Sequence, residues 1–207
     1  MIASAVAQWI DEMLARAAVA ERRERVAALR GEFEARTGSF VPSDAYFEAR
    51  SAAFWDDALT RGAFGCELAG ELGQGAAALA TPLARAHRGL FRAAPAAEGF
   101  HLVDEWSGAE FVVLPATEGL RDALERAAGL IDGRVVGVPD GPIVLLSGAL
   151  FHAADALEPM RALLPIARER SMATHDVLDA LLRMDRALRT LSRVKAAFAY
   201  RKEALAR

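Results

Sequence analysis

Apolar residues recur at helical spacing along the first part of the chain and predict a mainly helical N-terminal region. Residues 2–37 fit one long helix or a broken pair of helices, because the apolar stripe that contains Ile10 resumes at Val26 after the polar segment AERRER. A second helix is expected to begin after an N-cap at Ser43, a residue type that caps helices well. Residues 76–93 are expected to be helical again.

The hydrophobic period changes near Phe100, where apolar and polar residues begin to alternate as they do in β-strands. Gly108 and the turn Pro139-Asp140-Gly141 each separate two strand-like segments, and a short helix capped by Thr117 lies between these pairs. The expected strands are residues 100–105, 110–115, 134–138 and 142–151. Four short strands joined by tight turns favour a small, strongly curved antiparallel sheet or half-barrel.

After Phe151 the chain is expected to be helical to its end. Pro159 and Pro165 are expected to break the first part, and from Thr174 onward one helix could run for about thirty residues, or about 45 Å. Apolar residues follow the 4, 3, 4, 3 spacing of a helical seam at Val177, Leu181, Met184, Leu188 and Leu191, and Phe198 continues it. Such a helix is longer than a compact sheet, so the N-terminal helix or another subunit has to cover it.

These elements predict a single α+β domain. Its long N- and C-terminal helices are expected to pack around a small antiparallel β unit of about four strands. The expected parts are a helical region over residues 1–95, the β unit with one short helix over residues 96–150, and C-terminal helices over residues 151–207.

Composition narrows the class of protein. The chain has 207 residues, of which 53% are hydrophobic and 26% charged, as in globular proteins with a sizeable core. Cys66 is the single cysteine, so a cysteine-based zinc site is excluded. The N-terminus lacks the basic start of a signal peptide, and no apolar run approaches the ~18 residues of a membrane span. We therefore expect a cytoplasmic protein with no membrane partner.

Two segments carry a resemblance to a known group of proteins. RAHRGLFRAAPAAEGFHLVDEWSGAEFVV, residues 85–113, resembles a widespread family of uncharacterised bacterial proteins in which a helix leads into a strand reading "l-DL-sG--f-V". LLSGALFHAADA, residues 145–156, is similar to the last strand of their small β unit. Many members end in a cysteine-rich SEC-C type zinc motif, which this chain lacks. The resemblance implies helices followed by a β unit, and it implies neither a zinc site nor a catalytic residue.

A histidine and three carboxylates fall within ten residues, at His101, Asp104, Glu105 and Glu110. Such a group could serve acid–base chemistry, hold a metal or form the polar rim of a β-hairpin. The three carboxylates flank a Ser-Gly turn, where solvated polar residues are expected. We therefore interpret this stretch as a hairpin.

The best metal-like set in the sequence is His152, Asp155, His175 and Asp176. His175-Asp176 matches the dipeptide with which HD phosphohydrolases bind a metal that activates water. The same dipeptide fits a helix N-terminus, where the helix dipole favours an aspartate. These four residues are weak metal candidates, and a metal-dependent phosphohydrolase of HD type is the third functional hypothesis.

Charge is distributed unevenly along the chain. Residues 183–207 hold eight basic and two acidic groups, a net charge of +6, and because the whole chain carries −3, residues 1–182 carry −9. A strip that contacts phosphates would explain this asymmetry. So would a solvated arginine-rich face in which some arginines pair with the acidic body.

The expected function is a non-catalytic protein-binding or scaffolding module without a cofactor. Partner contacts are expected at Leu188, Leu191, Phe198 and Tyr200, and a homodimer is expected because helical seams often pair between chains. The alternative is a nucleic-acid-binding accessory protein. It would use Arg186, Arg189, Arg193, Lys195 and Arg201, with Phe198 and Tyr200 stacking on bases.

Overall fold

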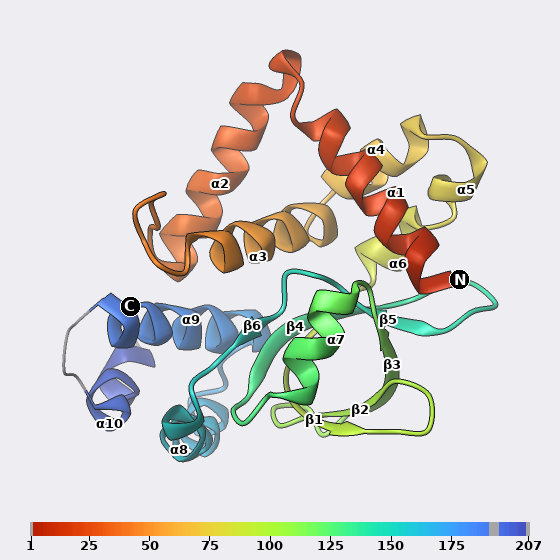
Figure 1. The fold of residues 1–207 in the computed structure, drawn as a ribbon. Coiled ribbons are helices and arrows are strands. Elements are labelled where there is room, and N and C mark those ends of the chain that lie inside the picture. Colours follow the sequence, from red (N-terminus) through yellow and green to blue (C-terminus); the bar gives the residue numbers. More distant parts are fainter. Residues whose placement is uncertain (1, 191–194, 206–207) are drawn as a thin grey trace.

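The N-terminal helices form a cap over one side of a β-barrel, and the C-terminal helices lie beside the barrel (Figure 1). The computed structural model describes residues 2–190 and 195–205. The cap contains α1 (Ile2–Ala17), the 3-10 helix η1 (Ala20–Arg22), α2 (Arg23–Thr37), α3 (Phe47–Thr60), α4 (Phe64–Glu71), α5 (Gln74–Ala77) and α6 (Ala80–Ala84). The first two helices are the broken pair that the sequence allowed. The expected N-cap at Ser43 is wrong, since the next helix begins at Phe47. Ser43 lies instead in a turn, in which the Asp44 carboxylate accepts a hydrogen bond from the Val41 amide and the Asp44 amide donates to the Val41 carbonyl.

The sheet is a closed barrel, so the expected antiparallel unit of about four strands is wrong. Its strands are β1 (His87–Pro95), β2 (Phe100–Asp104), β3 (Glu110–Pro115), β4 (Ile131–Gly137) and β5 (Ile143–Leu145). The order is β1-β2-β3-β5-β4, and β1 closes the ring by pairing with β4. The β3–β5 pair is parallel, and all other pairs are antiparallel. Helix α7 (Glu118–Glu125) joins β3 to β4, so the connectivity is that of the OB fold. A short sixth strand, β6 (Leu150–Phe151), pairs with β4.

Strand β1 is the element that closes the barrel, and it replaces the second half of the helix expected over residues 76–93, whose first half contains α6. Its first half pairs with β4 and its second half with β2, and Phe91 belongs to both ladders. Arginine, alanine and leucine dominate HRGLFRAAP and are good helix formers, but pairing with two strands overrides that propensity. Gly89 permits the close packing, because a Cβ there would lie 2.6 Å from Phe91 and 2.9 Å from Asp104.

Both faces of β1 and β4 are covered, which decides where their polar side chains lie. Phe91 on β1 and Ile131 on β4 contribute to the cluster that fills the barrel, together with Phe100 and Val113. The alternate residues face outward beneath the helices, so six consecutive positions of β4 are buried. Charged residues on this outer face, such as Arg88, are therefore enclosed between the barrel and the helices.

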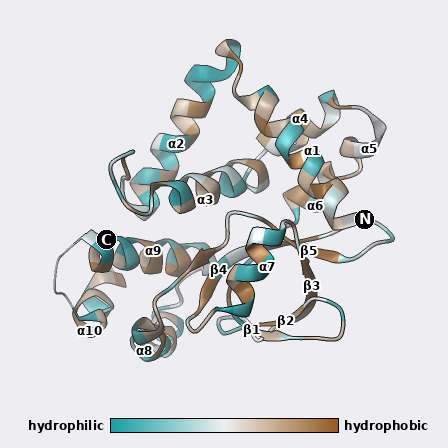
Figure 2. Cartoon of the chain, viewed as in Figure 1, coloured by the Kyte–Doolittle hydropathy of each residue, from teal (hydrophilic) through white to brown (hydrophobic). Residues whose placement is uncertain are grey.

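Two further hydrophobic clusters attach the helices to the barrel. One fills the cap and reaches the barrel at Val136 and Val144. The other packs the C-terminal helices against Leu90 of β1. Figure 2 shows hydrophobic residues concentrated along the strands and many hydrophilic residues on α2, in which only Phe33 and Thr37 are buried.

The C-terminal part is built from short helices. It contains the 3-10 helix η2 (Ala154–Ala156), α8 (Leu157–Glu169), α9 (Thr174–Thr190), α10 (Ala196–Ala199) and the 3-10 helix η3 (Lys202–Leu205). Pro165 lies inside α8 and does not break it. The expected helix of about thirty residues is wrong, since α9 ends at Thr190 and Lys195 is extended before α10. No helix among the described residues is long and apolar enough to cross a membrane.

Candidate functional site

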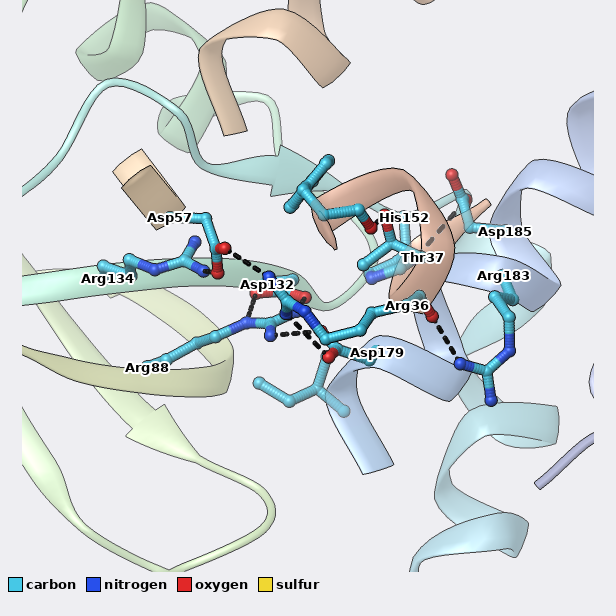
Figure 3. Close-up of polar contacts among 12 residues, drawn as sticks. Arg36, Thr37, Asp57, Arg88, Asp132, Arg134, His152, Asp179, Arg183 and Asp185 are labelled. Atoms are coloured by element: carbon cyan, nitrogen blue, oxygen red, sulfur yellow. Dashed lines mark hydrogen bonds and ion pairs between the residues drawn. The ribbon is translucent and has the colours of Figure 1, made fainter. Parts of the chain in front are cut away.

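A buried chain of alternating charges, here called the polar seam, joins the cap, the barrel and α9 (Figure 3). It consists of Arg36 from α2, Asp57 from α3, Arg88 from β1, Asp132 and Arg134 from β4, and Asp179 from α9. Strand alternation places Arg88, Asp132 and Arg134 on the outer face of the barrel, where the helices cover them.

Arg88 is the centre of the polar seam. Its Nε and Nη2 donate to the two carboxylate oxygens of Asp132 at 3.0 and 2.8 Å, and its Nη1 donates to Asp179 at 2.6 Å. Burial works against the charged form, but these two carboxylates raise the pKa of Arg88 above its ordinary value. Bidentate pairing of this kind fixes the guanidinium in one orientation.

Arg36 extends the polar seam into the cap. Its Nη1 donates to Asp179 at 2.9 Å and its Nη2 to Asp57 at 2.6 Å. The second oxygen of Asp57 accepts from Arg134. Although burial opposes its charged form, Arg88 and Arg36 together hold the pKa of Asp179 below its usual range.

The polar seam contains three arginines and three aspartates, so its formal charges cancel. Two clefts reach it, of about 270 and about 210 Å³, and Arg36 lines both of them. The two terminal nitrogens of Arg36 already bind Asp57 and Asp179. The carboxylates of the polar seam itself are all paired with arginines, so the seam is suited to holding the parts of the fold together. The exposed carboxylates of Asp176 and Glu32 line the larger and the smaller cleft, respectively, outside the seam.

The hairpin interpretation of residues 101–110 agrees with the observed contacts, but Asp104 is not solvated. Its fully buried carboxylate accepts hydrogen bonds from the amides of Leu90 and Trp106 and from the Ser107 hydroxyl, and it lies 3.0 Å from His87 Nε2. Burial opposes ionisation, yet these bonds hold the pKa of Asp104 below its usual value. Asp104 thus stabilises the start of the β2–β3 turn.

The other charged residues of that stretch are closer to the surface. His101 Nε2 lies 3.1 Å from Glu110 across the two strands. Glu105 accepts hydrogen bonds from Arg161 at 2.7 Å and from Arg92 at 3.2 Å, which connects the hairpin to α8. The four polar residues therefore lie in separate contacts and form no common acid–base site.

The structure does not bring the metal candidates together. Within residues 2–190 and 195–205, no group of three or more histidine, cysteine, aspartate or glutamate side chains could hold a metal ion. Asp155, His175 and Asp176 are exposed. His152 is buried, and its Nδ1 lies 3.3 Å from Asp185 and 3.2 Å from the Tyr200 hydroxyl.

The group formed by His152, Asp185 and Tyr200 fixes the C-terminal segment to α9. Arg189 donates to the second oxygen of Asp185 at 2.7 Å. Burial disfavours the Asp185 anion, but contacts with His152 and Arg189 hold its pKa below the usual range. Burial and the nearby Asp185 charge raise the pKa of Tyr200, which remains protonated. His152 Nε2 is buried without a hydrogen-bond partner among the described residues, so no substrate reaches it.

Much of the C-terminal basic strip is bound to the body of the protein. Arg183 donates to the Arg36 carbonyl and Arg186 to the Ser39 carbonyl, at and just beyond the C-terminus of α2. Arg189 donates to the Phe151 carbonyl at 2.8 Å as well as to Asp185. Cations at a helix C-terminus stabilise its free carbonyls and its dipole. These hydrogen bonds go to backbone carbonyls and to Asp185 of the same segment, so the acidic excess of residues 1–182 was not a signal for them.

Lys195 and Arg201 are the remaining described cations of the nucleic-acid hypothesis. Both are exposed, and neither makes an ion pair with a described residue. Arg193 lies outside the described residues, as does Leu191 of the expected partner-binding set.

An apolar groove lies between α9 and the last short helices. The C-terminal groove, of about 320 Å³, is lined by Arg183, Met184, Ala187, Phe198, Ala199, Arg201 and Ala204. The Phe198 side chain is 71% exposed, more than any other large hydrophobic residue among those described. Of the other expected partner contacts, Leu188 is half-buried, and Tyr200 is 4% exposed and lies inside the fold.

The outer face of β2 and β3 is the surface with which OB folds bind oligonucleotides and oligosaccharides. Here it presents Val103 and Val112 beside the His101–Glu110 pair. The aromatic residues of these strands, Phe100 and Phe111, belong to the cluster that fills the barrel. No aromatic platform for bases is therefore present on this face among the described residues of β2 and β3.

The fold alone does not identify the function, since one fold supports many activities. Comparison of the chain with protein-family models, with curated proteins and with solved structures gave no match. The resemblance of residues 85–113 to a bacterial family therefore stays a prediction. Function has to be inferred from the residues that the structure leaves exposed.

Proposed function

We propose that this protein is a non-catalytic protein-binding module whose contact surface is the C-terminal groove. The exposed ring of Phe198 at the edge of an apolar hollow carries this proposal. Burying such a side chain in a complex would contribute about 1.5–3 kcal/mol, and aromatic anchors of this kind dominate many interfaces. The cytoplasmic location expected from the sequence stays a prediction.

The complete pairing of the aspartates in the polar seam supports a non-catalytic role. Each aspartate of the polar seam accepts hydrogen bonds from arginine. His152 and Asp185 resemble a base and its orienting carboxylate, but the free nitrogen of His152 is enclosed. General acid–base residues need to lie within reach of a substrate proton, and these do not.

The apolar stripe of α9, which favoured a homodimer in the sequence, is already covered within one chain. Val177, Leu181 and Met184 belong to the cluster that packs α9 against α8, α10 and the barrel. Arg183 and Arg201 line the C-terminal groove, so two copies that met through it would bring like charges together. The homodimer stays a prediction, and we favour a different protein as the partner.

A second candidate function is binding of single-stranded nucleic acid, which the exposed Lys195 and Arg201 favour. It predicts binding of a labelled RNA or DNA that weakens strongly between about 50 and 200 mM salt. The variant Lys195→Glu/Arg201→Glu should abolish that binding. Unchanged anisotropy of the labelled RNA and DNA at low salt would remove this candidate.

Selection from a random peptide library displayed on phage tests the proposed function. The full chain is the target, Phe198→Glu is the counter-target, and Val112→Glu is the matched control, because Val112 is also exposed (56%) but lies on the barrel. We expect enriched peptides that bind the wild type and Val112→Glu but not Phe198→Glu. Peptides that bind all three chains equally, or no enrichment, would overturn the proposal.

A further inference from the structure

The surroundings of the C-terminal groove are strongly basic. Arg183 and Arg201 line it, and Lys195 and Lys202 lie exposed at the starts of α10 and η3. Glu203 is the one acidic residue among the described residues 195–205. A partner that fits this surface has to supply negative charge around the side chain that enters the hollow.

The floor of the C-terminal groove is apolar and small. Met184, Ala187, Ala199 and Ala204 form it, and Phe198 forms one wall. Small alanine side chains leave room for a partner side chain, and about 320 Å³ suits one or two large apolar residues. The hollow therefore favours an apolar side chain of the partner, and the surrounding cations favour acidic residues on either side of it.

From this juxtaposition we infer that the C-terminal groove binds an acidic segment of a partner protein. That segment presents one large apolar side chain, such as leucine or phenylalanine, flanked by aspartate or glutamate. The inference rests on the proposed function and adds the chemistry of the partner. A second copy of this chain is disfavoured by the like charges around the groove, and a nucleic acid offers no aliphatic side chain for the apolar floor.

An anionic membrane surface is the other occupant that a basic, aromatic patch could take. The patch has a single exposed large apolar residue, Phe198, whereas interfacial helices bury a whole apolar face. Tyr200 and Leu205, its neighbours in the same segment, are turned into the core. The geometry therefore favours a single anchoring side chain from a protein.

Three labelled synthetic peptides of equal length and identical apolar residues test the inference. Their remaining positions are glutamate, glutamine or lysine, and fluorescence anisotropy with the full chain gives each Kd. We expect the glutamate peptide to bind at least tenfold more tightly than the glutamine peptide, and the lysine peptide not to bind. Raising the salt from about 50 to about 200 mM should reduce this preference, because exposed charges are screened.

Two variants separate the inference from the proposed function. Phe198→Glu should bind none of the three peptides, whereas Lys195→Gln/Arg201→Gln should still bind peptide but without the preference for glutamate over glutamine. Binding that depends on Phe198 but shows no preference for acid would overturn the inference and leave the proposed function standing. No Phe198-dependent peptide binding would overturn both. Phe198-dependent binding to vesicles of phosphatidylcholine with phosphatidylserine, without peptide binding, would assign the surface to a membrane instead.

Discussion

At the scale of single residues, this protein depends on buried charges whose partners are far apart in the sequence. Arg88 lies 44 positions from Asp132 and 91 positions from Asp179. Because no local sequence pattern indicates such distant pairs, the polar seam was not predicted. A weak signal existed in IDGRVVG, where Asp132 and Arg134 alternate with apolar residues of a strand that is buried on both faces.

Arg88→Met should destabilise the fold strongly. The substitution keeps much of the side-chain volume but leaves Asp132 buried without its bidentate partner, so we expect a loss of about 3–5 kcal/mol in the free energy of unfolding. Urea denaturation measures this loss. Arg92→Met is the matched control on the same strand, because Arg92 is 60% exposed and its pair with Glu105 should be worth less than about 1 kcal/mol. If Arg88→Met and Arg92→Met lower the free energy of unfolding equally, burial of the Arg88 ion pairs contributes nothing to stability.

Asp56→Asn should stabilise the protein at alkaline pH. Asp56 is 2% exposed, and burial raises its pKa to about 7, while its Oδ2 accepts from the Gly148 amide at 2.8 Å. In the unfolded chain the pKa is about 4. Between about pH 4 and pH 7 the folded state therefore binds more protons, and the contribution of Asp56 to stability falls as the pH rises through this window.

Asparagine can keep the Gly148 hydrogen bond without the charge. We expect Asp56→Asn to unfold at a higher temperature than the wild type at pH 8, by an amount equivalent to roughly 1–3 kcal/mol. The gain should shrink towards pH 5. Asp140→Asn, in an exposed turn, should behave as the wild type at both pH values. A gain that is the same at pH 5 and pH 8 would contradict the assigned pKa.

At the scale of elements, the sequence correctly predicted the helices and strands whose ends are marked by local signals. The β2–β3 hairpin and the helix capped by Thr117 lie where they were expected, because a Gly108 turn and an N-cap mark them. Strand β1 was missed because its pairing with both β2 and β4 is a tertiary property. The length of the last helix was overestimated because the apolar seam continues across Lys195, where the backbone is extended.

The two glycine turns of the β1–β2–β3 meander should respond differently to alanine. Gly99 and Gly108 both have positive φ, +87° and +75°. A Cβ at Gly99 would lie 2.1 Å from the Val113 carbonyl oxygen, whereas a Cβ at Gly108 would meet nothing within 4 Å. Gly108→Ala should cost about 1–2 kcal/mol for the left-handed backbone alone, and Gly99→Ala clearly more. Chemical denaturation measures both, and equal costs would contradict the close approach of β3 to this turn.

At the scale of the whole molecule, the cap and the barrel are joined by an apolar cluster and by the polar seam. Asp57 has a special position, because it binds Arg36 of the cap on one oxygen and Arg134 of the barrel on the other. Arg88, by contrast, joins β1, β4 and α9, and its side chain makes no hydrogen bond to the described residues of α2 or α3. The two residues should therefore stabilise different parts of the fold.

Amide hydrogen exchange distinguishes these roles. Asp57→Asn should speed exchange in α2 and α3 while β1–β3 keep their protection, since the barrel retains its own ladder and the Arg88 pairs. Arg88→Met should lower protection in β1, β4 and α9 as well. Arg23→Met, an exposed position at the start of α2, serves as the control and should change neither pattern. If Asp57→Asn instead lowers the protection of cap amides and barrel amides equally, the cap and the barrel unfold as one unit. In that case opening the cap alone costs as much free energy as global unfolding.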